Sequence, residues 1–131
     1  MKSNFIKKQI DKYKKLDKCF CLSLQEDVFF NADGLHHILY YRRRPRKYSE
    51  KYYRASLITH IIEVIENAKL AIKRIESENP LVVTWSLEHK ITNVDFEQVV
   101  KVILRKKGNG RIYFLSVMSN KTKKKTKKSK P

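Results

Sequence analysis

Apolar residues recur at helical spacing in two long segments of the first half of the chain. Residues 2–18 place apolar side chains among lysines, a pattern typical of a basic amphipathic helix. Residues 55–68 carry the clearest helical stripe, and Ser56 is their expected N-cap. A short apolar run at residues 20–24 predicts a strand. The first half of the chain is therefore expected to be mainly helical.

A third, shorter helix is expected in the stretch NADGLHHILYYRRRPR, residues 31–46. Asn31 is a good N-cap, because its side-chain oxygen can accept a bond from a free amide of the first turn. Pro45 disfavours helical geometry in the residue before it, so the helix should end by about Arg43. The polar residues 44–53 are predicted to form an irregular connection.

The hydrophobic period changes to two in the second half of the chain. Residues 81–90 alternate apolar and polar side chains, and residues 99–118 read as two strands around Gly-Asn-Gly at 108–110, a strong hairpin signal. Residues 70–76 predict one further strand. The order, N-terminal helices followed by a three- to four-stranded antiparallel sheet, predicts an α+β fold.

A two-residue turn in the last hairpin determines which side chains share a face. One face then mixes cationic, hydroxyl and apolar side chains: Lys101, Ile103, Arg105, Ile112, Phe114 and Ser116. The other face is apolar and is the predicted core: Val100, Val102, Leu104, Tyr113, Leu115 and Val117. A three-residue loop would reverse this register. With the two-residue turn, Arg105 and Ser116 are near neighbours on a surface along which an RNA strand could lie.

The composition adds a large positive charge to this fold. The 131 residues are enough for one domain and include 30 Lys and Arg against 13 Asp and Glu, a net charge of +17. We expect an amphipathic helix at 1–18, an α+β domain at 19–118 and a disordered tail at 119–131. The tail holds seven lysines, so residues 1–118 keep 17 − 7 = +10. A charge of this size favours a polyanion partner, and RNA is the first candidate.

The cysteines and the N-terminus bear on compartment and cofactors. Cys19 and Cys21 would share a strand face, which is poor geometry for a disulfide, and no signal peptide or membrane-spanning run is evident. A cytoplasmic protein with no membrane partner is therefore expected. The two cysteines with His36 and His37 could supply four zinc ligands, but their spacing matches no standard zinc pattern. No metal or other cofactor is therefore predicted.

Histidines and arginines are the side chains best suited to chemistry on RNA. Cleavage without a metal needs a base for the 2′-hydroxyl, a cation for the charged phosphorane and an acid for the leaving oxygen. Histidine titrates near neutrality, and arginine stays charged and can bind phosphate through two hydrogen bonds. The candidates are His36, His37, His60 and His89, with arginines at positions 42, 43, 44, 46, 54, 74, 105 and 111.

Each of these residues also has a purely structural interpretation. Only one of the adjacent residues His36 and His37 can face the core, where a carbonyl would satisfy it. The arginines at 42–44 suit a helix C-terminus whatever the function. His60 lies on the polar flank of its helix near Glu63, and His89 could lie exposed at the rim of the sheet.

Three segments in order, DVFFNADGLHHILYYRR, ASLITHIIEVIENA and VVKVILRKKGNGRIYFLSVM, resemble the barnase–EndoU–colicin–RelE-like nucleases, particularly their phage and mobile-element branch. The resemblance covers about residues 22–118. It implies N-terminal helices followed by an antiparallel sheet, and metal-independent ribonucleases that often act as toxins. His37-Ile38 matches a His-Ile pair on the family's first helix, and Ser116 matches a Ser or Thr of its final strand. Arg105 occupies a strand position where the family often has a basic residue.

The chain departs from the family pattern at two points. An Arg-His pair often follows the helix histidine in the family, whereas the corresponding YYRRRPRK contains no histidine. The doubled His36-His37 leaves two candidates for the helix histidine. We favour His37 because it precedes Ile38, as in the family.

These observations predict a metal-independent endoribonuclease, with toxin-like activity implied by the resemblance. The expected catalytic residues are His37 as acid and base, Arg44 and Arg105 as phosphate clamp, and Ser116 as a positioning group. Side chains expected to bind the nucleic acid are Arg42, Arg43, Arg46, Lys47, Lys101, Arg111 and Tyr113. RNA is the expected partner, and a cognate inhibitor protein is a further candidate. The alternative is a non-catalytic RNA-binding module that stacks bases on Tyr40, Tyr41 and Tyr113.

Overall fold

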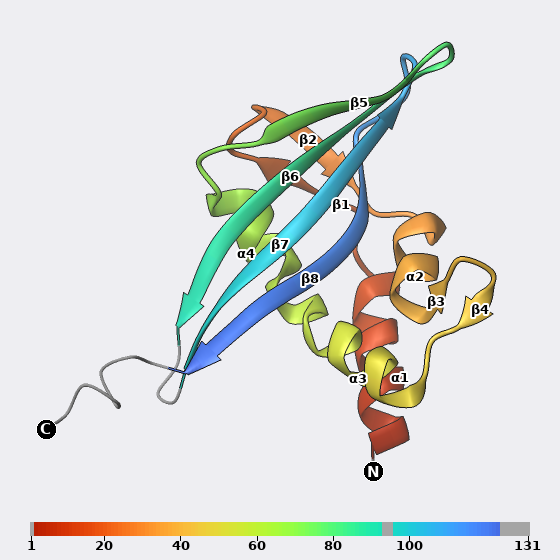
Figure 1. Cartoon of the computed structure of the whole chain (residues 1–131), viewed down its shortest axis with the longest axis vertical. Coiled ribbons are helices and arrows are strands. Elements are labelled where there is room, and N and C mark those ends of the chain that lie inside the picture. Colours follow the sequence, from red (N-terminus) through yellow and green to blue (C-terminus); the bar gives the residue numbers. More distant parts are fainter. Residues whose placement is uncertain (1, 93–95, 124–131) are drawn as a thin grey trace, which may run out of the picture.

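A computed structural model describes residues 2–92 and 96–123, which form an α+β fold with a curled sheet (Figure 1). The helices in these residues are α1 (Lys2–Lys14), α2 (Ala32–Leu39), α3 (Tyr48–Ser56) and α4 (Ile58–Asn67). The main sheet consists of β1 (Lys18–Cys21), β2 (Glu26–Phe29), β5 (Ile72–Glu78), β6 (Leu81–Thr92), β7 (Phe96–Lys107) and β8 (Tyr113–Lys123). A small hairpin of β3 (Tyr40–Tyr41) and β4 (Arg44–Pro45) joins α2 to α3.

The α+β class is confirmed, but the predicted three- to four-stranded antiparallel sheet is too small. The sheet has six strands in the order β1-β2-β8-β7-β6-β5. All neighbours are antiparallel except β2 and β8, which pair in parallel through Phe29 and Tyr113. The strand expected at 20–24 lies instead at Lys18–Cys21, and β2 was not expected. Both are four residues long, too short to display a clear alternation.

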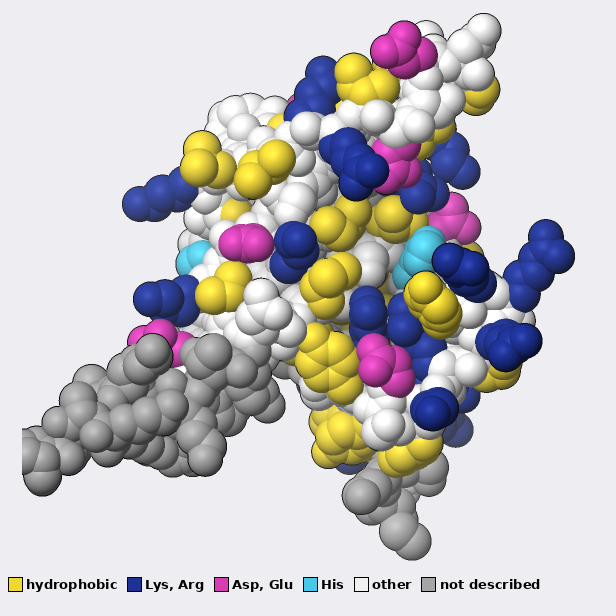
Figure 2. Space-filling view, viewed as in Figure 1, with side chains coloured by type: hydrophobic (Ala, Val, Ile, Leu, Met, Phe, Trp, Pro, Cys, Tyr) yellow, Lys and Arg dark blue, Asp and Glu magenta, His cyan; other side chains and the backbone are white. Residues whose placement is uncertain are grey.

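The core lies between α4 and one face of the sheet. The apolar stripe of α4 is buried through Ile61 and Ile65 against the strands, with contacts to β1, β6 and β7. A helix forms at the N-terminus as expected, but α1 ends at Lys14 rather than near residue 18, and it adds Ile6 and Tyr13 to the same core. The opposite face of the sheet is open and mixes apolar with charged side chains (Figure 2).

The predicted boundaries of the later helices also need correction, and α4 begins at Ile58 rather than at residue 55. Helix α2 ends at Leu39 rather than near Arg43, because Tyr40 is already extended and the chain turns back through the β3–β4 hairpin. The connection predicted as irregular contains α3, which ends at a turn around Leu57 before α4 begins. Ser56 is therefore not the cap of the later helix, and its hydroxyl donates to the carbonyl of Tyr53 at 2.6 Å.

The β7–β8 hairpin confirms part of the predicted register and corrects the rest. Ile103 lies opposite Ser116, but an irregularity follows, and Leu104 then pairs with Phe114 and Arg105 with Tyr113. Alternation along β7 keeps Arg105 on the face that carries Ser116. Phe114 and Ile112 were expected on the polar face but lie in the core, whereas Tyr113 and Leu115 are not part of the core cluster. The connection between the strands spans residues 108–112, so the assumed two-residue turn is wrong.

The structure also bears on the predicted C-terminal tail and on membrane-spanning helices. Strand β8 continues through Lys123, so it extends into the predicted tail at 119–131. The remainder of that tail, residues 124–131, lies outside the described residues. In the part of the chain that the structure describes, no helix is both long and apolar enough to cross a bilayer.

Candidate functional site

Helix α2 packs closely against β8 and thereby places His37 beside the sheet. The Asn31 side chain accepts hydrogen bonds from two backbone amides of the first turn, at 3.0 and 3.4 Å, so the predicted N-cap is confirmed. Gly34 lies against Phe114, and a Cβ at this position would collide with the phenyl ring. Ile38 is buried in the core, and the neighbouring His37 is left half-buried at the edge of the sheet.

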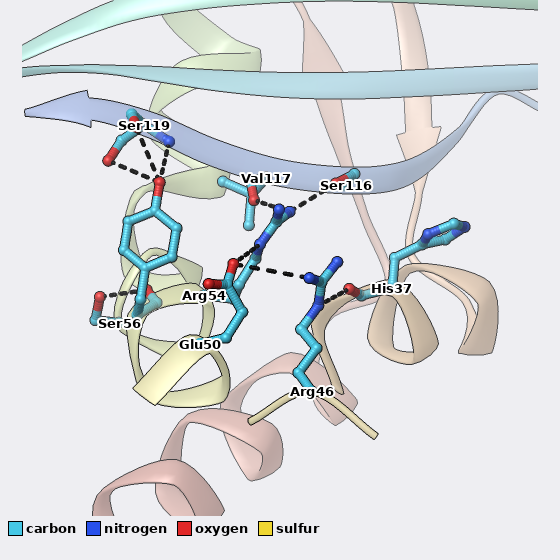
Figure 3. A network of polar contacts seen from close by, with 9 residues as sticks. His37, Arg46, Glu50, Arg54, Ser56, Ser116, Val117 and Ser119 are labelled. Carbon is cyan, nitrogen blue, oxygen red and sulfur yellow. Dashed lines mark hydrogen bonds and ion pairs between the residues drawn. The ribbon is translucent and has the colours of Figure 1, made fainter. Parts of the chain in front are cut away.

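Helix α3 covers the edge of β8 with two side chains (Figure 3). Arg54 Nη1 donates to the carbonyl of Val117 at 2.9 Å and lies 3.3 Å from the hydroxyl of Ser116. The hydroxyl of Tyr53 donates to the Ser119 carbonyl at 2.9 Å and accepts from the Ser119 amide at 2.6 Å. These contacts satisfy backbone groups of a strand that pairs with β2 at one position only.

Two arginines at this edge share one carboxylate. Glu50 Oε2 lies 3.2 Å from Arg54 Nε and 3.7 Å from Arg46 Nη1. Arg46 Nε also donates to the backbone carbonyl of His37 at 3.1 Å. The side chains of Arg46 and Arg54 are only 9% and 15% exposed, whereas that of Glu50 is 42% exposed. Burial, and then the charge of Arg54, lower the pKa of Arg46, so the two cations form a strongly electropositive pair.

Arg105 and Tyr113 face each other across β7 and β8, and both have unsatisfied polar atoms. Within the described residues, Arg105 Nε and the Tyr113 hydroxyl are buried without a hydrogen-bond partner. Arg105 Nη2 lies 3.6 Å from Glu76 Oε1, which is a long distance for an ion pair. An unpaired buried polar atom costs about 1–3 kcal/mol, so such groups are uncommon in native folds. Both atoms are closed to solvent, so the candidate contact for an anionic ligand is the accessible part of Arg105, whose side chain is 23% exposed.

His37 lies near enough to both Arg46 and Arg105 for their charges to affect its pKa. Its pKa is lowered below the ordinary value of 6.5, first by burial and then by the positive charge of Arg105. His36 and Arg46 lower the pKa further, and Asp33 raises it. His37 is therefore mainly neutral at pH 7 and can accept a proton, with arginines on two sides.

The β3–β4 hairpin presents aromatic and cationic side chains next to this site. The guanidinium carbons of Arg42 and Arg46 lie 5.4 and 5.5 Å from the centre of the Tyr41 ring. His36 is exposed and stacks on Tyr40, with ring centres 4.6 Å apart. Lys and Arg side chains gather on this side of the molecule around a histidine (Figure 2). The hairpin is thus a basic surface with exposed aromatic rings.

The structure brings together some of the predicted site residues and leaves others apart. His37, Arg105, Ser116, Arg46 and Tyr113 lie in or beside the site described above. Arg44 is exposed on β4, and no described contact joins it to His37. The remaining predicted RNA-binding residues lie around the site or away from it: Arg42 and Arg43 on the hairpin, Lys47 before α3, Lys101 on the open face of β7, and Arg111 with its guanidinium 4.2 Å from the Phe29 ring centre.

Two residues of the site were not singled out by the sequence. Arg54 appeared only among the arginines, and Glu50 was not considered, because residues 44–53 were interpreted as irregular. Glu50 and Arg54 are four residues apart on α3, which is the spacing of an ion pair on one helix face, and Arg46 lies four residues before Glu50, just ahead of the helix. This charge pattern was the available signal for α3.

The other histidines and the cysteines lie elsewhere. His89 Nε2 is 3.6 Å from Glu63 of α4, and burial lowers the pKa of His60. Cys19 and Cys21 are both buried on β1 as free thiols, and burial raises the pKa of Cys19 to about 12. Among residues 2–92 and 96–123, no three histidine, cysteine or acidic side chains are grouped as they would be around a metal ion.

Comparison with known proteins identifies a family. Residues 3–114 match the large polyvalent protein-associated domain 3, so the match spans most of the chain and includes every helix of the site. No curated protein and no solved structure gives a significant match. The match suggests a mobile-element, polyvalent-protein context, as in the branch expected from the sequence, and no nuclease family is shown. The chain belongs to the large polyvalent protein-associated domain 3 family.

Proposed function

We propose that the protein is a metal-independent endoribonuclease whose active site lies between α2 and the β7–β8 pair. His37 takes the proton of a ribose 2′-hydroxyl, and that oxygen attacks the adjacent phosphorus. The bond from phosphorus to the 5′-oxygen breaks, and the proton held by His37 returns to this oxygen directly or through water. The products are a 2′,3′-cyclic phosphate and a 5′-hydroxyl.

The position of His37, half-buried on α2 where this helix packs on β8 and with Arg105 nearby, is the observation that carries this proposal. A general base must be unprotonated at working pH, and the lowered pKa of His37 meets that requirement. The nearby charge of Arg105 that contributes to this shift is also the charge that a phosphorane needs. The same arrangement therefore favours both the base and the stabilising cation.

Four side chains besides His37 have roles in the proposed function. The Arg105 side chain is 23% exposed, so the accessible part of its guanidinium can bind a phosphoryl oxygen, and the buried Tyr113 hydroxyl beside it is a second donor once the side chain shifts. Ser116 is held by Arg54 and positions the RNA along β8. Arg44, expected as part of the phosphate clamp, is assigned instead to binding of the flanking RNA from the hairpin.

A non-catalytic RNA-binding module is the second candidate function. The stacked rings of His36 and Tyr40, and the exposed Tyr41 between two guanidiniums, favour it, since single-stranded RNA binds through stacking and backbone charge. Binding on this surface is compatible with both functions. The two differ only in whether His37 acts on the RNA.

Incubation of the full chain with RNA in EDTA separates the two functions. The nuclease proposal requires shortened RNA with 2′,3′-cyclic phosphate and 5′-hydroxyl ends. Intact RNA that is nevertheless bound would favour the binding module. Activity that is lost in EDTA and restored by zinc or magnesium would contradict the metal-independent mechanism. A toxin-like role with a cognate inhibitor protein remains part of the proposal and is tested by expression in cells with growth as the readout.

A further inference from the structure

We propose that Arg46 and Arg54 form a phosphate-binding fork beside His37, and that the Glu50 carboxylate occupies this fork until a phosphate of the RNA backbone displaces it. The inference rests on the proposed function for the nature of the ligand. The contacts of Arg46 and Arg54 with Glu50 are present without RNA. Glu50 is then a residue that limits affinity for RNA.

The fork is incompletely satisfied by Glu50. One carboxylate oxygen serves both arginines, and its 3.7 Å distance to Arg46 is too long for a hydrogen bond. In the described residues, the hydrogen bond of the Arg46 guanidinium is the one from Nε to the His37 carbonyl. Each guanidinium carries five N–H donors. A phosphodiester group, whose single negative charge is shared by two non-bridging oxygens, can accept from both arginines at once.

The carboxylate faces a solvent-accessible pocket with cationic walls. The pocket has a volume of about 420 Å³ and is lined by Tyr41, Arg44, Pro45, Arg46, Lys47, Ser49 and Glu50. Arg44 and Lys47 are exposed, whereas the Arg46 side chain is 9% exposed, and Arg54 does not line the pocket. An anion that enters along Arg44 and Lys47 therefore meets Arg46 and the Glu50 carboxylate first, and it reaches Arg54 when that carboxylate is displaced.

The fork is also rigidly connected to the candidate catalytic site. Arg54 is held to β8 by Val117 and Ser116, and Arg46 is held to α2 through the carbonyl of His37. In Figure 3 the His37 ring points away from the two guanidiniums, so the fork and the ring can take different phosphates of one strand. We therefore assign the fork to a phosphate next to the one that is cleaved.

The test compares Glu50→Gln with the wild-type chain in binding to a short DNA oligonucleotide. DNA has no 2′-hydroxyl, so the measurement does not depend on cleavage. The variant removes the competing charge but keeps the shape of the side chain, and we expect binding at least about threefold tighter at low salt. Arg46→Ala should weaken binding roughly tenfold to a hundredfold, the cost of charge-assisted hydrogen bonds. It should also flatten the dependence of log K on log salt by about 0.7.

Two matched variants control for overall charge. Glu26→Gln changes the same charge on β2, and Arg74→Ala removes an exposed arginine on β5. Unchanged or weaker binding by Glu50→Gln would overturn the proposal, as would equal gains from Glu26→Gln or equal losses from Arg46→Ala and Arg74→Ala. An acidic peptide of equal charge that competes as well as the oligonucleotide would also overturn it, because the site would then not select phosphate.

The outcome is independent of whether the protein cleaves RNA. If the protein does not cleave RNA but Glu50→Gln and Arg46→Ala still change oligonucleotide binding as expected, the nuclease proposal is rejected and the phosphate-binding fork stands. Because Arg54 also supports β8, Arg54→Ala can unfold the chain, so Arg54→Lys is measured with it. Lysine keeps the charge but cannot bind a phosphate through two parallel hydrogen bonds. We therefore expect the oligonucleotide affinity of Arg54→Lys to lie between those of the wild-type chain and Arg54→Ala.

Discussion

Replacement of His37 by alanine should abolish most cleavage while the fold and RNA binding persist. Loss of a general acid or base lowers rates by roughly 10²- to 10⁴-fold. At about 1.4 kcal/mol for each factor of ten, this is a barrier increase of about 3–5 kcal/mol. The fold should survive, because Arg46 bonds the backbone carbonyl of His37, which alanine retains, and alanine favours the helix more than histidine does.

His36→Ala is the matched control for this prediction. His36 is exposed and its described aromatic contact is the stack on Tyr40, so its removal costs about 0.5–1.5 kcal/mol of stacking and leaves the chemical step unchanged. Single-turnover cleavage of a labelled RNA gives the rate, anisotropy gives binding, and urea unfolding gives stability. Cleavage by His37→Ala within about threefold of wild type, with the fold intact, would refute the assignment of the base.

The pH dependence provides a second readout of the same residue. The neutral imidazole is the base, so kcat/KM must fall as pH decreases through the pKa of His37, and this limb should lie below 6.5. Among the nearby charges, that of Arg105 lowers the pKa of His37 most, and Arg105→Ala should therefore move the limb toward higher pH. A limb that does not move would mean that another group titrates.

Three further outcomes are expected. Gly34→Ala should destabilise the fold by up to about 2 kcal/mol in urea unfolding. The new Cβ meets Phe114 and the Tyr13 hydroxyl, which costs about 1–3 kcal/mol, and alanine's helix preference returns about 1. Arg105→Ala should reduce kcat/KM by roughly 10²-fold or more, and Lys106→Ala should reduce it much less, since alternation places Lys106 on the other face of β7. Truncation after Lys123 removes five lysines and should flatten the slope of log K for RNA binding against log salt by up to about 3.5. The fold should keep its stability, which a cut within β8 would lower.

The long periodic segments were predictable because each buries one clear face. The helices α1 and α4 and the strands β6 to β8 follow the hydrophobic pattern of the sequence, and Asn31 caps α2 as expected. Strand β5 was also expected, although it is exposed along almost its whole length. Strand β1 was misplaced and β2 was missed, because a four-residue strand gives too few positions for a period. Helix α3 was missed because it buries little apolar surface and is fixed by polar contacts of Tyr53 and Arg54 instead.

The candidate site was predictable in its residue types and only partly in its members. His37, Arg105 and Ser116 were selected from the sequence, and the structure places them near one another. Arg44 was preferred to Arg46 although they are two residues apart. Arg44 is exposed and the Arg46 side chain is mostly buried, because the β3–β4 hairpin reverses the chain at Arg42, which adopts a positive φ of 58°. A local turn of this kind has no periodic signal, so the sequence alone did not separate the exposed arginine from the buried one.

The location of the site follows from the way the sheet is completed. Strand β8 pairs with β2 at one position only, so a long part of its edge needs other hydrogen-bond partners. Arg54 and Tyr53 supply them, and covering the edge with an arginine brings a cation next to Ser116 without a dedicated binding loop. The close approach of α2 at Gly34 brings His37 to the same edge. Stability and proposed function therefore depend on the same contacts. For this reason conservative variants, which keep the edge covered while the charge or the proton acceptor changes, are the ones that can separate the two.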